Sequence, residues 1–130
     1  MPTVGDLATK APFEQAKYDG KRPYFLDEFG GIKCLEANPI DEEILRRDGG
    51  KLTSWGYGKA AQTKEDFYKR LESQVKAIIS HSDKICGFCY TQLTDVEQEQ
   101  NGVYYYNRES KYDMPRVKAI FQMAAPGYEQ

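Results

Sequence analysis

Only two segments of this 130-residue chain have the length and composition of a buried β-strand. The first is the run Tyr24-Phe25-Leu26, which lies between Pro23 and Gly30-Gly31, and the second covers residues 85–93. Short apolar runs rich in aromatic residues and bounded by Gly or Pro are typical of strands. A sheet of two strands buries little apolar surface and leaves both of its edges open.

Helix signals follow each strand. Thr63 is a good N-cap with Asp66 three residues later, which predicts a helix over residues 63–80. Shorter helices are expected over residues 41–47 and after Pro115. The order strand, long loop, helix, repeated twice, is typical of βα units with parallel strands. The apolar stripe of the long helix comprises Phe67, Tyr68, Leu71, Val75, Ile78 and Ile79.

The chain is too short for a complete (β/α)8 barrel, which takes about 250 residues. We therefore expect an α/β fold that forms a partial (β/α)8 TIM barrel, the last two βα units with long loops. Residues 1–20 are interpreted as a polar lead-in, residues 21–125 as the barrel fragment and residues 126–130 as a tail.

Charge and composition exclude several classes of function. Eighteen Lys and Arg against twenty Asp and Glu leave a net charge of -2, so a nucleic-acid partner is not expected. No apolar run approaches the roughly 20 residues of a membrane span, and the first residues lack an export signal. Three cysteines are too few for a disulfide scaffold, and they leave the compartment open.

Neither a metal site nor a cofactor site is expected. Cys86 and Cys89 have the CxxC spacing, but residues three apart on a strand face opposite sides. Zinc needs four ligands, and only Cys34 and His81 remain. The chain has no glycine-rich phosphate motif and no GxSxG sequence, so nucleotide and serine-hydrolase chemistry are also not expected.

Glu28 is the strongest candidate for chemistry because it ends the first strand and precedes Phe29 and two glycines. Active sites of α/β proteins gather at the carboxyl ends of the strands. The structural alternative is that Glu28 caps the strand or pairs with an arginine.

Retaining glycoside hydrolysis requires a second carboxyl group about 5 Å from the first. Asp95 and Glu97 follow the second strand, and parallel neighbours lie about 4.8 Å apart, so both are candidates. Asp27 is a poorer partner because strand alternation turns it to the opposite face. Acidic residues in polar loops more often shape the loop, and this alternative is favoured for Asp95 and Glu97.

Aromatic residues make up 13% of the chain, and several lie near the predicted site. An aromatic face stacks on the C–H face of a sugar, so Trp55, Tyr57 and Tyr90 are candidates for binding a carbohydrate. Binding and packing are equally good interpretations of Trp55. The run Tyr104-Tyr105-Tyr106 is interpreted as packing, because consecutive strand residues point in different directions.

Three motifs occur in a specific order: Pro23 to Gly31 (PYFLDEFGG), Trp55 to Gly58 (WGYG), and Gly87 to Glu99 (GFCYTQLTDVEQE) followed by Asn101-Gly102. Together they resemble the end of the catalytic domain of family two glycoside hydrolases, the β-galactosidase and β-glucuronidase family. The resemblance covers roughly residues 20–121 and implies barrel strands seven and eight.

The resemblance implies that Glu28 is the catalytic nucleophile and that Tyr90 lies under the sugar, with Tyr where Trp is frequent. The family's acid/base is a Glu preceded by Asn, and no Asn-Glu pair occurs in this sequence. We therefore expect a fragment of a retaining β-glycosidase that is inactive or nearly so alone, since the acid/base supplies a factor of about 10² to 10⁴. The expected substrate-binding residues are Trp55, Tyr57, Tyr90, Gln92 and Asp95.

A noncatalytic carbohydrate-binding or interaction module that uses the same aromatic loops is the alternative function. The expected partners are a carbohydrate substrate and either the missing portion of the barrel or a second copy of the chain, which would cover the open sheet edges.

Overall fold

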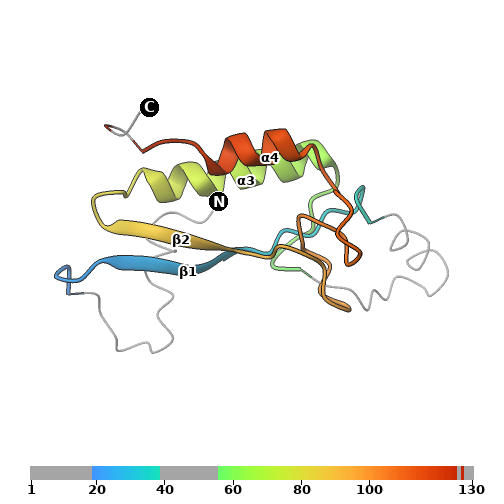
Figure 1. Cartoon of the computed structure of the whole chain (residues 1–130), viewed down its shortest axis with the longest axis horizontal. Coiled ribbons are helices and arrows are strands. Elements are labelled where there is room, and N and C mark those ends of the chain that lie inside the picture. The colour runs from blue at the N-terminus through green and yellow to red at the C-terminus, as the bar shows by residue number, and fades with distance from the viewer. Residues whose placement is uncertain (1–18, 39–55, 126, 128–130) are drawn as a thin grey trace.

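The computed structural model of the protein describes residues 19–38, 56–125 and 127. The described elements are β1 (Tyr24–Gly30), α3 (Lys64–Ile79), β2 (Ile85–Thr91) and α4 (Met114–Phe121), in that order. β1 and β2 pair in parallel as a two-stranded sheet. Figure 1 shows α3 and α4 on the same side of the two strands. The protein is thus a small α/β domain with one layer of helices over one layer of strands.

The prediction of a partial (β/α)8 barrel is wrong. The described residues form a single parallel strand pair and two helices, which is a small α/β domain and not a clear section of barrel wall. A barrel wall is defined by the tilt and stagger of successive strands, and one strand pair fixes neither. The predicted parallel pairing is confirmed. The helix expected over residues 41–47, most of the lead-in and most of the tail lie outside the described residues.

β1 is longer than the sequence indicates, because it continues through Glu28 to Gly30. Its register with β2 is irregular between Leu26 and Phe29, where the ladder skips two residues. Both skipped residues, Asp27 and Glu28, are exposed. Regular alternation was expected to turn Asp27 and Glu28 to opposite faces of the sheet. The strand is irregular at these two residues, as is usual at a β-bulge, so this expectation does not apply to them.

The long helix α3 confirms the prediction from its capping signal and apolar stripe. Thr63 Oγ1 accepts a hydrogen bond of 3.1 Å from the Asp66 amide, and the first turn carries Glu65 and Asp66. Such a cap stabilises a helix by about 1 kcal/mol, and the acidic first turn complements the helix dipole. The buried residues of α3 are Phe67, Tyr68, Leu71, Val75 and Ile78.

The second helix, α4, packs beside α3 and closes the core. Asp113 is its N-cap, and the Asp113 amide donates to Tyr68 Oη at 2.8 Å. Arg116 makes a bidentate pair with Glu65 at 2.7 and 2.8 Å. The sheet contributes Leu26, Phe29 and Ile85 to this core, and α4 contributes Val117 and Ile120.

Candidate active site

Glu28 and Tyr57 form a hydrogen-bonded pair at the carboxyl end of β1. Tyr57 Oη donates to Glu28 Oε1 at 3.0 Å, although the residues are 29 positions apart in sequence. Both side chains are exposed, Tyr57 by 46%. Sequence reasoning predicted each residue separately, as a nucleophile and as a sugar contact, and the structure brings them together.

Gly31 holds Tyr57 in this position. The Tyr57 amide donates to the Gly31 carbonyl at 2.7 Å. A Cβ atom on Gly31 would lie 2.2 Å from Tyr57 Cδ2, and the backbone of Gly31 has a φ of +65°. Glycine is the residue that combines this left-handed backbone with so close an approach of an aromatic ring.

The charge of Glu28 keeps Tyr57 in the protonated, hydrogen-donating form. The hydrogen bond to Glu28 raises the pKa of the Tyr57 phenol above its usual value, and desolvation and the charges of Glu28 and Glu99 act in the same direction. A phenolate would repel the carboxylate, whereas the phenol orients it. The pair therefore presents a carboxylate with one oxygen held and the other, Oε2, available for chemistry.

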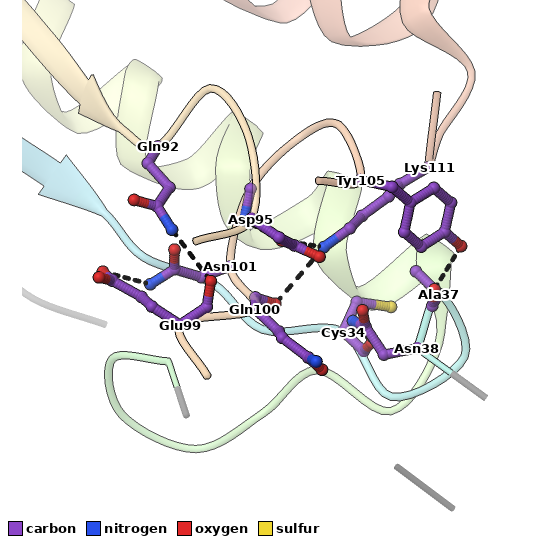
Figure 2. A network of polar contacts seen from close by, with 11 residues as sticks. Cys34, Ala37, Asn38, Gln92, Asp95, Glu99, Gln100, Asn101, Tyr105 and Lys111 are labelled. Carbon is purple, nitrogen blue, oxygen red and sulfur yellow. Dashed lines mark hydrogen bonds and ion pairs between the residues drawn. The ribbon is translucent and has the colours of Figure 1, made fainter. Parts of the chain in front are cut away.

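A second polar cluster lies in the loop that follows β2. The Gly31 amide donates to the Thr91 carbonyl at 2.7 Å, which ties the end of β1 to the end of β2. The next residue, Gln92, donates from Nε2 to the carbonyl of Glu99 at 3.1 Å. Asn101 Nδ2 donates to Glu99 Oε1 at 3.2 Å. Figure 2 shows the side chains of Gln92 and Asn101 both directed toward Glu99.

Glu99 is the centre of this polar cluster, and sequence reasoning did not single it out. Its backbone exchanges hydrogen bonds of 2.9 and 3.0 Å with Val96, so that the loop after β2 closes on itself. The sequence presents Glu99 as one acid in a polar run with Asp95 and Glu97. No local pattern distinguishes these three acids; their different environments come from the folding of the loop.

Asp95 is a buried structural carboxylate in the described fold. Its Oδ1 accepts from Lys111 Nζ at 2.5 Å and from the Gly102 amide at 2.9 Å. Asp95 is 6% exposed and Lys111 2%, and Figure 2 shows the pair next to Tyr105. This geometry supports the loop-structuring interpretation of Asp95. Asp95 also lines a cavity of about 660 Å³, together with Asn38, Glu97, Gln100 and Glu109.

Tyr90 packs against the core, and its described contacts are with core rings and not with Glu28. Its ring contacts those of Phe29 and Phe121 edge-on, with centroids 5.3 and 5.2 Å apart. Burial raises the pKa of its phenol, and the hydroxyl has no hydrogen-bond partner among the described residues. The structure therefore does not bring Tyr90 to the site, and its predicted role under the sugar has no geometric support.

The other aromatic residues considered in the sequence do not contact Glu28 in the described structure. Trp55 lies outside the described residues. Tyr105 donates to the Ala37 carbonyl and lies 5.3 Å from the Lys111 ammonium, which is a packing role. Tyr106 is 70% exposed. Of the predicted aromatic contacts, Tyr57 is the one that the described structure places at Glu28.

A cavity of about 470 Å³ adjoins the Glu28–Tyr57 pair. Its lining residues come from the end of β1, the segment that begins at Tyr57 and residues 69–77 of α3. This arrangement gives the pair a concave neighbour that can hold a small polar ligand. Its lining includes Gly30, Ile32, Tyr57, Lys59, Lys69 and Arg70.

The described residues contain no cluster of three or more His, Cys, Asp or Glu side chains that could hold a metal ion. Cys34 is buried, and Cys86 and Cys89 are both exposed. In the same part of the chain, neither helix has the length and apolar character needed to cross a bilayer.

Comparison with known proteins identifies no relative of the chain. No protein-family model matches the chain, and a search of curated proteins finds no match either. The resemblance to family two glycoside hydrolases therefore stays a prediction from motifs, and the geometry of Glu28 and Tyr57 is the independent support for a function.

Proposed function

We propose that the chain carries the nucleophile of a retaining β-glycosidase, with Glu28 as the attacking carboxylate and a β-galactoside or β-glucuronide as the substrate class. The observation that supports this most strongly is the hydrogen bond from Tyr57 to Glu28 at the carboxyl end of a parallel strand. Active sites of α/β proteins gather at this edge. The motifs around Glu28, Tyr57 and residues 87–99 supply the choice of chemistry and of sugar class.

The geometry fits the first step of retaining hydrolysis. Tyr57 holds Oε1 of Glu28, so Oε2 attacks the anomeric carbon. The bond from this carbon to the leaving-group oxygen breaks, the oxygen departs with the bonding electrons, and a covalent glycosyl ester remains on Glu28. Water then displaces the sugar from the carboxylate, with overall retention. Tyr57, which is part of the lining of the 470 Å³ cavity, keeps the carboxylate oriented and offers its ring edge to the sugar.

The proposed chemistry depends strongly on the leaving group. The family's Asn-Glu acid/base pair is absent from this sequence. Glu28 alone should attack glycosides whose leaving group departs without a proton, and should be inactive or nearly so on poor leaving groups, where general acid catalysis contributes a factor of about 10² to 10⁴.

Release of dinitrophenolate from dinitrophenyl β-galactoside and β-glucuronide tests this function. We expect the purified chain to release dinitrophenolate above the spontaneous rate and Glu28→Gln to abolish that release. Asp27→Asn is the matched control, because Asp27 is the exposed neighbouring carboxylate and lacks the Tyr57 contact. Release at the spontaneous rate, or equal release by Glu28→Gln, contradicts the proposal. Binding of an oligosaccharide without release would instead establish the noncatalytic module.

A further inference from the structure

We propose that the cavity of about 470 Å³ beside Tyr57 binds a monosaccharide phosphate. This binding site lies beyond the proposed glycosidase chemistry, because Glu28 is not among the described residues that line the cavity. Pockets of this size hold small molecules in many proteins, and a sugar ring with one charged substituent falls within that class.

Three cationic side chains line the cavity. Lys59 lies in the segment before α3, and Lys69 and Arg70 lie on this helix. The described lining contains no carboxylate. The whole chain has a net charge of -2, so three cations around one cavity do not follow from a generally basic composition. A cavity lined by charge of one sign attracts a ligand of the opposite sign, which here is an anion.

The described carboxylates do not neutralise these cations. None of the three makes an ion pair with a described residue; the ion pairs of α3 are Lys76 with Glu72 and Glu65 with Arg116. Glu65 lies one turn before Lys69, but both of its carboxylate oxygens accept hydrogen bonds from Arg116. An anion in the cavity would therefore gain charge contacts that the described fold does not already use.

The segment that carries Lys59 is fixed at both of its ends. The Tyr57 amide donates to the Gly31 carbonyl at 2.7 Å, and the Ala61 amide donates to the Lys33 carbonyl at 2.8 Å. These hydrogen bonds tie both ends of the segment to the chain that follows β1. The backbone around the cavity is thus already in place, which lowers the ordering cost of binding a ligand.

Arg70 joins this segment to α3. Its Nη1 donates a hydrogen bond to the Lys59 carbonyl, so the two cationic residues belong to one connected wall. The guanidinium has further N–H donors in a planar fork, whose geometry matches the oxygens of a carboxylate or a phosphate. Arg70 therefore contributes both to the wall and to the recognition of an anion.

The number of cations favours a phosphate monoester over a carboxylate. At neutral pH a phosphate monoester carries a charge of about -1.5 to -2 and three acceptor oxygens. A carboxylate carries a single charge on two oxygens. Three cations without a lining acid match the larger charge. The ammonium groups of Lys59 and Lys69 suit phosphate as point charges, and Arg70 adds paired donors.

The rest of the lining suits a sugar ring. Ser73 and Gln74 of α3 are polar, and Ile32 and Ala77 provide apolar surface. Gln74 Oε1 has no hydrogen-bond partner among the described residues, and a ligand hydroxyl is the kind of donor that this oxygen lacks. A sugar presents hydroxyl groups at its edge and C–H groups on its face, so it matches a lining of both kinds.

Calorimetric titration of the full chain with glucose 6-phosphate, inorganic phosphate, glucose and glucuronate tests this assignment. We expect glucose 6-phosphate to bind most tightly and glucose to bind at least about tenfold more weakly, because glucose lacks charge-assisted hydrogen bonds. No binding of glucose 6-phosphate, or binding of inorganic phosphate or glucuronate as tightly, contradicts a monosaccharide phosphate as the ligand. Because binding is measured without turnover, such a failure leaves the proposed glycosidase function standing.

Lys59→Gln and Lys69→Gln locate the ligand. Both lysines are exposed, so their replacement spares the core, and each variant should bind glucose 6-phosphate about threefold to tenfold more weakly. Lys76→Gln is the matched control, because it removes the same charge from α3 at an exposed residue outside the described lining. Its affinity should equal that of the wild type. Unchanged affinity in both test variants, or an equal loss in Lys76→Gln, would overturn the site.

Discussion

Tyr57 Oη donates a hydrogen bond to Glu28 Oε1 at 3.0 Å, and this contact joins the end of β1 to a segment beyond the undescribed residues 39–55. The contact gives Glu28 a defined orientation that an exposed glutamate would otherwise lack. It also makes Tyr57 a reporter of the charge on Glu28, because a phenol responds to a neighbouring carboxylate through its pKa.

Replacement of Glu28 should therefore shift the titration of Tyr57. The hydrogen bond to Glu28 is the main reason that the pKa of Tyr57 is raised, so Glu28→Gln should lower this pKa toward its usual value. Glu99→Gln should lower it by less, because only the charge of Glu99 acts on the phenol. Tyrosine-selective carbon NMR during an alkaline titration, with Tyr57→Phe to assign the signal, measures both shifts. Identical titrations in all three proteins would show that the contact is absent in solution.

Gly31→Ala should displace Tyr57 from Glu28. The new Cβ would lie 2.2 Å from the Tyr57 ring, and a φ of +65° adds a backbone cost of about 1–2 kcal/mol. Gly20→Ala is the matched control, because Gly20 has a φ of +73° and no heavy atom within 4 Å of the added carbon. Chemical denaturation should show a larger loss for Gly31→Ala, and the pKa of Tyr57 should fall in Gly31→Ala alone. Equal losses in the two variants would contradict the close approach.

Lys111→Met should destabilise the fold strongly. The substitution leaves the Asp95 carboxylate buried without its ammonium, and breaking a buried ion pair in this way costs about 3–5 kcal/mol. Lys76→Met removes the exposed pair with Glu72 and should cost less than about 1 kcal/mol. Urea unfolding measures both values, and a loss below that of the control would show that Asp95 does not depend on Lys111.

Tyr112 should make the protein sensitive to alkaline pH. Its ring is stacked on Phe67 with centroids 3.8 Å apart, and burial raises the pKa of its phenol. The folded state then keeps Tyr112 protonated while the unfolded state ionises near pH 10, so stability is complete below about pH 10 and falls above it. The slope is at most about 1.4 kcal/mol per pH unit for this residue. Tyr112→Phe should reduce the fall, and Tyr106→Phe, at an exposed position, should not. Equal slopes in the wild type and Tyr112→Phe would show that Tyr112 ionises in the folded state.

Local signals in the sequence predicted the secondary structure well. The Thr63 cap and the stripe from Phe67 to Ile78 depend on neighbours within one or two helical turns, so the pattern alone locates α3. The parallel pairing of β1 and β2 also followed from the order of the elements. The sequence did not predict correctly whether the strands belong to a barrel. The curvature and closure of a barrel depend on the tilt and stagger of many strands, which two apolar runs cannot define.

The candidate site was less accessible to sequence reasoning. Glu28 could be identified because it lies near the carboxyl end of a predicted strand. Its contact with Tyr57 depends on a backbone hydrogen bond between Tyr57 and Gly31 that no motif encodes. Asp95 and Glu99 look alike in sequence, and they differ because the loop buries one against Lys111 and holds the other by Asn101. Tyr90 was expected under a sugar, but its ring packs against Phe29 in the core.

Covalent trapping of Glu28 tests the central claim most directly. A dinitrophenyl β-galactoside or β-glucuronide with fluorine in place of the hydroxyl next to the anomeric carbon reacts readily with a nucleophile but releases the sugar slowly. Intact-mass measurement and peptide mapping after incubation should show one sugar bound to the peptide that contains Glu28, in the wild type and in Asp27→Asn but not in Glu28→Gln. No adduct with either reagent, or an adduct on a peptide without Glu28, would contradict the assignment of Glu28 as the nucleophile.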